Sequence, residues 1–163
     1  MFEELGSWLP VKDGDQRAAA LYKRHYSAHQ YKDGRRTRVG YRNRFLFIGP
    51  GEKMAMMTVT CDALFAWRKF IDDSGQKGVN CAIFRNESNL CSSKLILEAE
   101  QLAWNRWPNE RLYTYVDPAK IKSDNPGYCF KKAGWTLVRN EQGKPLLTKS
   151  GKLILEKLWK PIK

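Results

Sequence analysis

Five residues with side chains suited to proton transfer or stacking fall in two stretches of the chain. His25 and Tyr26 end a helical stretch, whereas Tyr115, Asp117 and Tyr128 flank the end of an apolar, strand-like stretch. An imidazole or a carboxylate can act as a general base, and a tyrosine can stack its ring or donate its hydroxyl. We therefore treat all five as candidate catalytic residues. The alternative for each tyrosine is a place at the edge of the core with its hydroxyl satisfied.

The two histidines of the chain raise the question of a metal site. His25 and His29 are four residues apart, so they would share one face of a helix that continued that far. Tyr115 or Asp117 could complete a set of ligands. A histidine at a helix end more often bonds backbone groups, and two histidines alone are weak support for a metal. The sequence leaves the presence of a metal unknown.

Positive charge dominates the chain and is clustered. Lys and Arg number 29 against 17 Asp and Glu, a formal charge of +12, which favours a polyanionic partner over a neutral metabolite. A segment at 31–44 has only Asp33 as an acid and carries six cations, which are Lys32, Arg35, Arg36, Arg38, Arg42 and Arg44. We predict a mobile basic loop that binds nucleic acid, with a solvated surface loop as the alternative. More scattered lysines near the end are expected only to solvate it: Lys149, Lys152, Lys157, Lys160 and Lys163.

Cysteine spacing and hydropathy bear on the compartment. No C-x-x-C pair occurs among the four cysteines, so they are predicted to be buried free thiols: Cys61, Cys81, Cys91 and Cys129. Residues 1–7 show no basic region followed by an apolar run, and no stretch reaches the roughly 18 apolar residues of a membrane span. We expect a cytoplasmic protein without a membrane partner.

The elements that must position these residues follow from periodicity and turn residues. A chain of 163 residues with 42% apolar content predicts one domain over 1–163, with the basic loop inserted before a central meander. The first half predicts a helix over 16–26 and strands over 8–11, 45–48, 54–60, 63–71 and 78–84. The turn at 49–52 has the length of a hairpin connection, so the strands on either side of it are predicted to pair.

The second half predicts an amphipathic helix over 92–107, stopped by Pro108, and a strand over 112–116. Asn125 is predicted to cap a short helix, with Pro126 in its first turn and Gly134 at its end. The segments 135–138 and 152–158 suggest a closing hairpin, although the last could be helical. We therefore predict an α/β (α+β) fold with a mixed, mostly antiparallel central sheet and helices on both faces.

This order of elements resembles the GNAT acyltransferases across nearly the whole chain. Their last helix ends in aromatic-x-x-x-Gly-aromatic, and Phe130, Gly134 and Trp135 match that pattern. The resemblance implies a GNAT-like fold and an acyl donor, which is acetyl-CoA or another acyl or aminoacyl donor. In many family members the position of Phe130 holds a tyrosine that protonates the departing thiolate, so conventional acetyl transfer to an amine is weakened here.

The family binds the coenzyme A pyrophosphate on a glycine-containing loop before its long helix. The matching segment here runs from Phe84 to Lys94, where Arg85 fits the first position but the glycines are missing. The cofactor-binding candidates that the resemblance implies are Arg85, Asn86, Ser92, Ser93, Lys94 and Asn125. A plain serine N-cap is the equally open alternative for the helix start.

Three strings resemble a narrower relative, the Mom-type DNA-modification proteins of phages. They are residues 24–27 (RHYS), 84–87 (FRNE) and 113–117 (YTYVD) continuing to 125–130 (NPGYCF). The resemblance implies an enzyme that converts adenine in double-stranded DNA to a carbamoylmethylated form and so protects phage DNA from restriction, in the host cytoplasm. An adenine amine must be flipped out of the duplex, stacked and deprotonated, which needs aromatic residues, a carboxylate and cations.

Three other functions remain open from the sequence. An acetyl-CoA-dependent N-acetyltransferase acting on a protein or small amine would need no DNA, but the missing glycine loop argues against it. An aminoacyl-tRNA-dependent transferase would also explain the charge. A nucleic-acid-binding protein that keeps the fold without chemistry is the non-enzymatic alternative.

Overall fold

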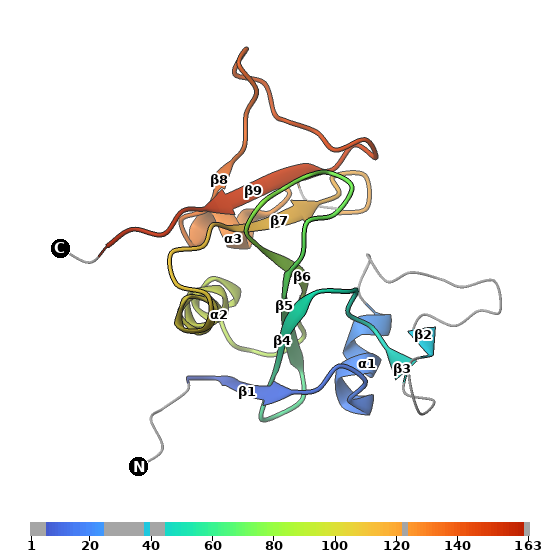
Figure 1. The fold of residues 1–163 in the computed structure, drawn as a ribbon. Helices are drawn as coiled ribbons and strands as arrows, with labels where there is room; N and C mark the ends of the chain where they lie inside the picture. Colours follow the sequence, from blue (N-terminus) through green and yellow to red (C-terminus); the bar gives the residue numbers. More distant parts are fainter. Residues whose placement is uncertain (1–5, 25–37, 40–44, 122–123, 162–163) are drawn as a thin grey trace.

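The computed structural model describes residues 6–24, 38–39, 45–121 and 124–161. Their main feature is a seven-stranded sheet in a mixed α/β arrangement (Figure 1). Its strands in spatial order are β1 (Trp8–Val11), β4 (Glu52–Thr58), β5 (Ala63–Lys69), β6 (Val79–Asn86), β7 (Leu112–Val116), β9 (Leu153–Lys157) and β8 (Thr136–Leu137). Within this sheet β6 and β7 pair in parallel and every other neighbouring pair is antiparallel. The prediction of a mixed, mostly antiparallel sheet is confirmed.

Alternating side chains of β5 divide the core into two clusters. Phe65 and Trp67 pack with helix α2 (Ser92–Arg106), and the Trp67 indole N–H donates to the carbonyl of Ala99 at 3.0 Å. Leu64 and Ala66 pack instead with helix α1 (Gln16–Lys23). This alternation is what a strand buried on both faces requires. No helix among the described residues is long and apolar enough to cross a bilayer.

One predicted pairing is wrong. The segment 45–48 was expected to form a hairpin with the strand after Gly51, but β3 (Phe45–Leu46) pairs with β2 (Arg38–Val39) in a separate two-stranded sheet. Both edges of β4 are occupied by β1 and β5. The Asp13 carboxylate accepts the backbone N–H groups of Phe47 and Ile48 at 2.8 and 3.2 Å, which provides the bonds that a hairpin partner would have made.

The short third helix also starts later than predicted. Helix α3 covers Tyr128–Lys132, and its N-cap is Gly127 at φ 78°, so Asn125 and Pro126 lie in the preceding turn. A Cβ on Gly127 would lie 2.4 Å from the Cδ1 atom of Leu155. Close packing on β9, together with the left-handed backbone, therefore requires glycine here. The closing hairpin of β8 and β9 is confirmed, and the helical alternative for the last segment is wrong.

Candidate functional site

The candidate site is the opening between strands β6 and β7. These strands pair only from Val79 opposite Leu112 to Cys81 opposite Thr114, after which they separate. A bulge starts the separation: Ala66 pairs with Ile83 and Trp67 with Cys81, so Ala82 has no partner on β5. A bulge bends its strand and strengthens the local twist, which turns β6 away from β7. The hydroxyl of Thr114 donates to the carbonyl of Cys81 at 3.0 Å and holds the point of separation.

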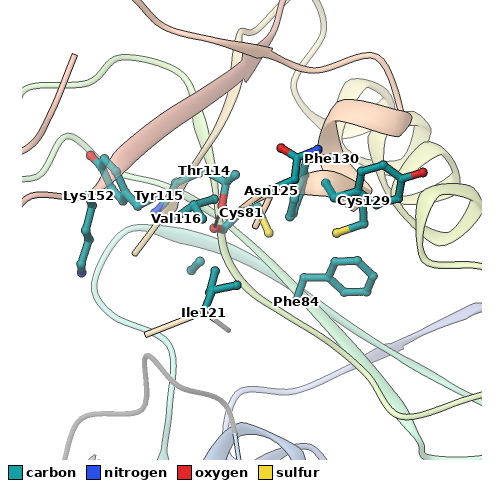
Figure 2. Close-up of a pocket in the computed structure, with 14 residues that line it drawn as sticks. Cys81, Phe84, Thr114, Tyr115, Val116, Ile121, Asn125, Cys129, Phe130 and Lys152 are labelled. Carbon is teal, nitrogen blue, oxygen red and sulfur yellow. Dashed lines mark hydrogen bonds between the residues drawn. The ribbon is translucent and has the colours of Figure 1, made fainter. Parts of the chain in front are cut away.

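A pocket of about 420 Å³ fills this opening. Figure 2 shows its labelled side chains, with Lys152 and Tyr115 at one end and Phe84, Cys129 and Phe130 at the other. Its lining residues come from β6, β7, position 121, residues 125–130 and the residue before β9: Asn80, Cys81, Ala82, Phe84, Thr114, Tyr115, Val116, Ile121, Asn125, Gly127, Tyr128, Cys129, Phe130 and Lys152. One end is therefore polar and the other mainly apolar, a combination typical of sites for small organic groups.

Tyr115 is held at the polar end by a carboxylate from another element. Its hydroxyl donates to Asp72, with distances of 3.0 and 3.1 Å to the two carboxylate oxygens, and also bonds the Ser74 hydroxyl. Burial and the nearby Asp72 carboxylate raise the pKa of Tyr115, so the phenol stays protonated. Burial works against a charged Asp72, but the hydrogen bonds from Ser74 and Tyr115 outweigh it and lower the pKa of that carboxyl. The pair is a neutral phenol donating to an anion.

Asn80 supplies a second polar group of the pocket wall. Its residue is only 5% exposed, and its amide oxygen is buried without a hydrogen-bond partner among the described residues. Arg68 lies opposite it on β5, and the Nε atom of Arg68 is likewise buried without such a partner. An unbonded buried polar group costs free energy, on the order of 1–3 kcal/mol. Asn80 is therefore a candidate for accepting an N–H group of a bound molecule.

Two of the five predicted catalytic residues line this pocket. They are Tyr115 and Tyr128, the latter 56% exposed at the start of α3. Asp117 does not line it, and its carboxylate accepts the backbone N–H of Ala119 in the turn after β7. His25 and Tyr26 lie outside the described residues, as does His29. In the part of the chain that the structure describes, no group of three His, Cys, Asp or Glu side chains could hold a metal ion.

Sequence reasoning missed Asp72 and Asn80. Asp72 lies between the strands predicted over 63–71 and 78–84, and it joins Tyr115 across 43 positions of sequence. Asn80 carried a usable signal, because it is a polar residue inside the apolar strand β6. Lys152, which lines the pocket, was grouped with residues that only solvate the chain end.

Two of the predicted cofactor residues, Arg85 and Asn86, already have partners within the protein. Arg85 forms an ion pair with Glu87 at 2.5 Å and donates to the carbonyl of Arg24 at 2.8 Å. The side-chain amide of Asn86 donates to the carbonyl of Leu90 and to the hydroxyl of Ser92 at 2.8 and 2.9 Å. Side chains therefore fill the turn before α2. In this turn a pyrophosphate would meet no bare glycine backbone, so the residues present fit the phosphates of coenzyme A poorly.

The other predicted binding residues are divided between described and undescribed parts of the chain. Ser93 is buried beside Cys91, Lys94 is exposed, and Asn125 lines the pocket while its side-chain oxygen accepts from Lys131 at 2.7 Å. The helix N-cap is Cys91, not a serine. Of the six cations predicted to bind nucleic acid, only Arg38 falls in a described strand, β2; the other five lie outside the described residues: Lys32, Arg35, Arg36, Arg42 and Arg44.

Comparisons with protein-family models, with curated proteins and with solved structures found no match to this chain. The pocket and the charge of the chain are therefore the grounds for a functional proposal.

The four cysteines are free, as predicted, but they are not all buried. Cys91 is exposed at the start of α2, where the Ser93 hydroxyl and the backbone N–H of Lys94 lower the pKa of its thiol to about 7. Burial raises the pKa of Cys81 and of Cys129. Because the thiolate is the reactive form, Cys91 differs from both in expected reactivity.

We expect iodoacetamide at pH 7 to alkylate Cys91 at least about 10-fold faster than Cys129, as measured by peptide mass spectrometry over time. The Cys91 rate should rise steeply as the pH increases through 7 and then level off. Ser93→Ala removes the main stabilising hydroxyl and should move this rise to higher pH. Labelling that begins at Cys81 or Cys129 in the folded protein would contradict the assignment.

Proposed function

We propose that this protein is a GNAT-like transferase that adds a small acyl-derived group, of the carbamoylmethyl type, to the exocyclic amine of adenine in double-stranded DNA. In a phage this modification would protect the DNA from restriction in the host cytoplasm. The observation that carries the proposal is the pocket between β6 and β7, polar at one end and mainly apolar at the other, in a chain with a charge of +12. The strand order supports the GNAT-like part, and the charge supports a polyanionic substrate.

The pocket suits a base that has been flipped out of a duplex. Enzymes that act on a base inside DNA extrude it, stack it on aromatic residues and bond its edge. Tyr128 offers an exposed ring at the start of α3, and the side-chain oxygen of Asn80 can accept an N–H group such as the adenine amine. The apolar walls of Phe84 and Phe130 are suited to hold the aliphatic part of the added group.

As the amine nitrogen bonds to the added carbon, the bond between that carbon and its donor breaks, the electron pair leaves with the donor, and the nitrogen loses a proton. A carboxylate is the ordinary acceptor for such a proton. We assign this role first to Asp72: the Tyr115 hydroxyl takes the amine proton as it passes its own proton to that carboxylate. Asp117 is the second candidate, although one of its oxygens is engaged by Ala119. The filled turn before α2 supports a donor other than coenzyme A, and an aminoacyl group remains compatible with the pocket.

The test is mass spectrometry of nucleosides from the DNA of bacteria that express the protein. We expect a heavier deoxyadenosine, and about 100-fold less of it with Tyr115→Phe, because the variant removes the hydroxyl that connects the amine to Asp72 and general base catalysis contributes roughly 10²–10⁴-fold. Tyr113→Phe is the matched control. Tyr113 is on the same strand, but its hydroxyl faces the backbone carbonyls of Phe70 and Gln76 and does not line the pocket.

If the two tyrosine variants gave equal amounts of modified deoxyadenosine, Tyr115 would have no role in the reaction. Unchanged nucleosides with soluble unmodified protein would instead exclude DNA modification under these conditions. In that case acylation of an amine or RNA-linked transfer becomes the better proposal.

A further inference from the structure

A long arm leaves the sheet between β8 and β9. It comprises residues 138–152 and extends away from the rest of the domain in Figure 1, where it is the orange segment between the two strands. Every residue from 139 to 147 is exposed. Short β-hairpin connections need only two to five residues, so an arm of this length does more than join two strands.

The arm is ordered by hydrogen bonds within itself and not by a core. Its first turn is closed by Asn140, whose side-chain oxygen accepts from the backbone N–H groups of Gln142 and Lys144, both at 3.0 Å. Its second turn is closed by Thr148, whose hydroxyl accepts from the backbone of Lys152 at 3.0 Å. Leu146 N–H donates to the Val138 carbonyl between the two turns. Such bonding gives the arm a defined shape while residues 139–147 stay exposed.

The side chains of the arm combine positive charge with exposed leucines. It carries four cations, Arg139, Lys144, Lys149 and Lys152, against the single acid Glu141. Leu146 is 36% and Leu147 54% exposed, side by side in the middle of the arm. In the described part of the chain no ion pair involves any of these four cations.

We propose that this arm is a docking element for double-stranded DNA, with Lys144 and Lys149 on phosphates and Leu147 in contact with the groove. The choice of DNA rests on the proposed function, but binding does not require the reaction. A two-stranded ribbon fits a DNA groove, and apolar side chains at base steps accompany local opening of the duplex. The position of the arm agrees with this role, because its last residue, Lys152, lines the pocket. DNA held along the arm therefore lies beside the site that is to receive the flipped base.

Charge complementarity favours DNA over the other partners that a basic, apolar arm could meet. Two adjacent leucines provide little area for insertion into a bilayer, whereas the four cations of the arm, none in an ion pair with a described residue, can neutralise phosphates of a duplex. An anionic membrane is therefore an outcome of the test and not the proposal.

The experiment measures fluorescence anisotropy of a short labelled duplex between about 50 and 200 mM salt. The variant Lys144→Gln/Lys149→Gln is compared with Lys12→Gln/Lys23→Gln, which removes the same charge from exposed positions near α1. Loss of two phosphate contacts should reduce the slope of log affinity against log salt by about 1.8 in the arm variant and leave it unchanged in the control. Leu147→Ala should weaken binding at every salt concentration with an unchanged slope, and Leu97→Ala, an exposed leucine on α2, should not.

If both lysine variants lost the same amount of DNA affinity, the arm would contribute only through the net charge of the protein, and the proposal would be wrong. Full DNA binding by the arm variant would also overturn it. Arm-dependent binding to vesicles containing phosphatidylserine, with DNA binding unaffected, would assign the arm to membranes instead. Failure of the proposed function has a different signature. If DNA binding depends on the arm but no modified nucleoside is found, the docking proposal is supported and the proposed transferase activity is contradicted.

Discussion

Ala82→Phe is expected to reduce the amount of modified deoxyadenosine more than 100-fold while the protein remains folded. Ala82 lies at the bulge where β6 leaves β7 and lines the pocket, so a phenyl ring there would occupy the space in which the reacting groups must meet. A 100-fold loss corresponds to about 2.7 kcal/mol of lost transition-state stabilisation, which displacement of a bound group readily exceeds. Because Ala82 is only half-buried, we expect the free energy of unfolding to change by less than about 1 kcal/mol.

The matched control is Ala20→Phe, the same substitution at an exposed position of α1. Ala20→Phe should leave both the amount of modified deoxyadenosine and the free energy of unfolding near those of the unsubstituted protein. Nucleoside mass spectrometry measures the first quantity and urea unfolding the second. Full modification by Ala82→Phe would show that the pocket between β6 and β7 does not hold the reacting groups. If Ala82→Phe does not fold, the same test is made with Ala82→Leu, whose side chain fills less space at the same position.

The sequence predicted a helix or strand well where the residues of that segment alone determine its structure. Helix α2 was predicted to within a residue because its apolar positions recur at helical spacing, and β7 because a short apolar segment lies between turn residues. The pairing of the 45–48 segment failed since Asp13, more than thirty positions away, binds its backbone donors. The start of α3 failed because contact with Leu155 on β9 requires glycine in the left-handed region at Gly127.

The candidate site was predictable only in part for the same reason. Tyr115 lies near the end of strand β7 and Tyr128 begins helix α3, so their position near a sheet opening could be inferred from order along the chain. The opening itself depends on the bulge at Ala82, which is a mismatch in register between two strands and leaves no mark in either strand alone. Asp72 and Asn80 reach the site only through the pairing of β6 with its two neighbours. Residues joined by long-range pairing need the fold before they can be grouped.

Gly78 directly precedes that pairing, which begins at Val79, and Gly78→Ala is expected to destabilise the protein by about 3 kcal/mol or more. Gly78 has φ 124°, and a Cβ there would lie 2.2 Å from the backbone oxygen of Arg111. The same oxygen accepts the N–H of Val79 at 2.8 Å, the first bond between the start of β6 and the residue before β7. An L-residue at this φ costs about 1–3 kcal/mol, and the clash adds the displacement of that bond.

Gly75→Ala separates the clash from the backbone strain. Gly75 lies in the same connection between β5 and β6 at φ 73°, but a Cβ there meets nothing within 4 Å. We expect it to cost only about 1 kcal/mol, and equal losses in the two variants by urea unfolding would contradict the role given to the Arg111 contact. If Gly78→Ala folds at reduced temperature, its Arg111 oxygen must have moved. The parallel pairing that sets the opening between β6 and β7 then moves with it. Modification should therefore fall in Gly78→Ala even in the folded fraction and persist in Gly75→Ala, because the position of the pocket depends on where that pairing begins.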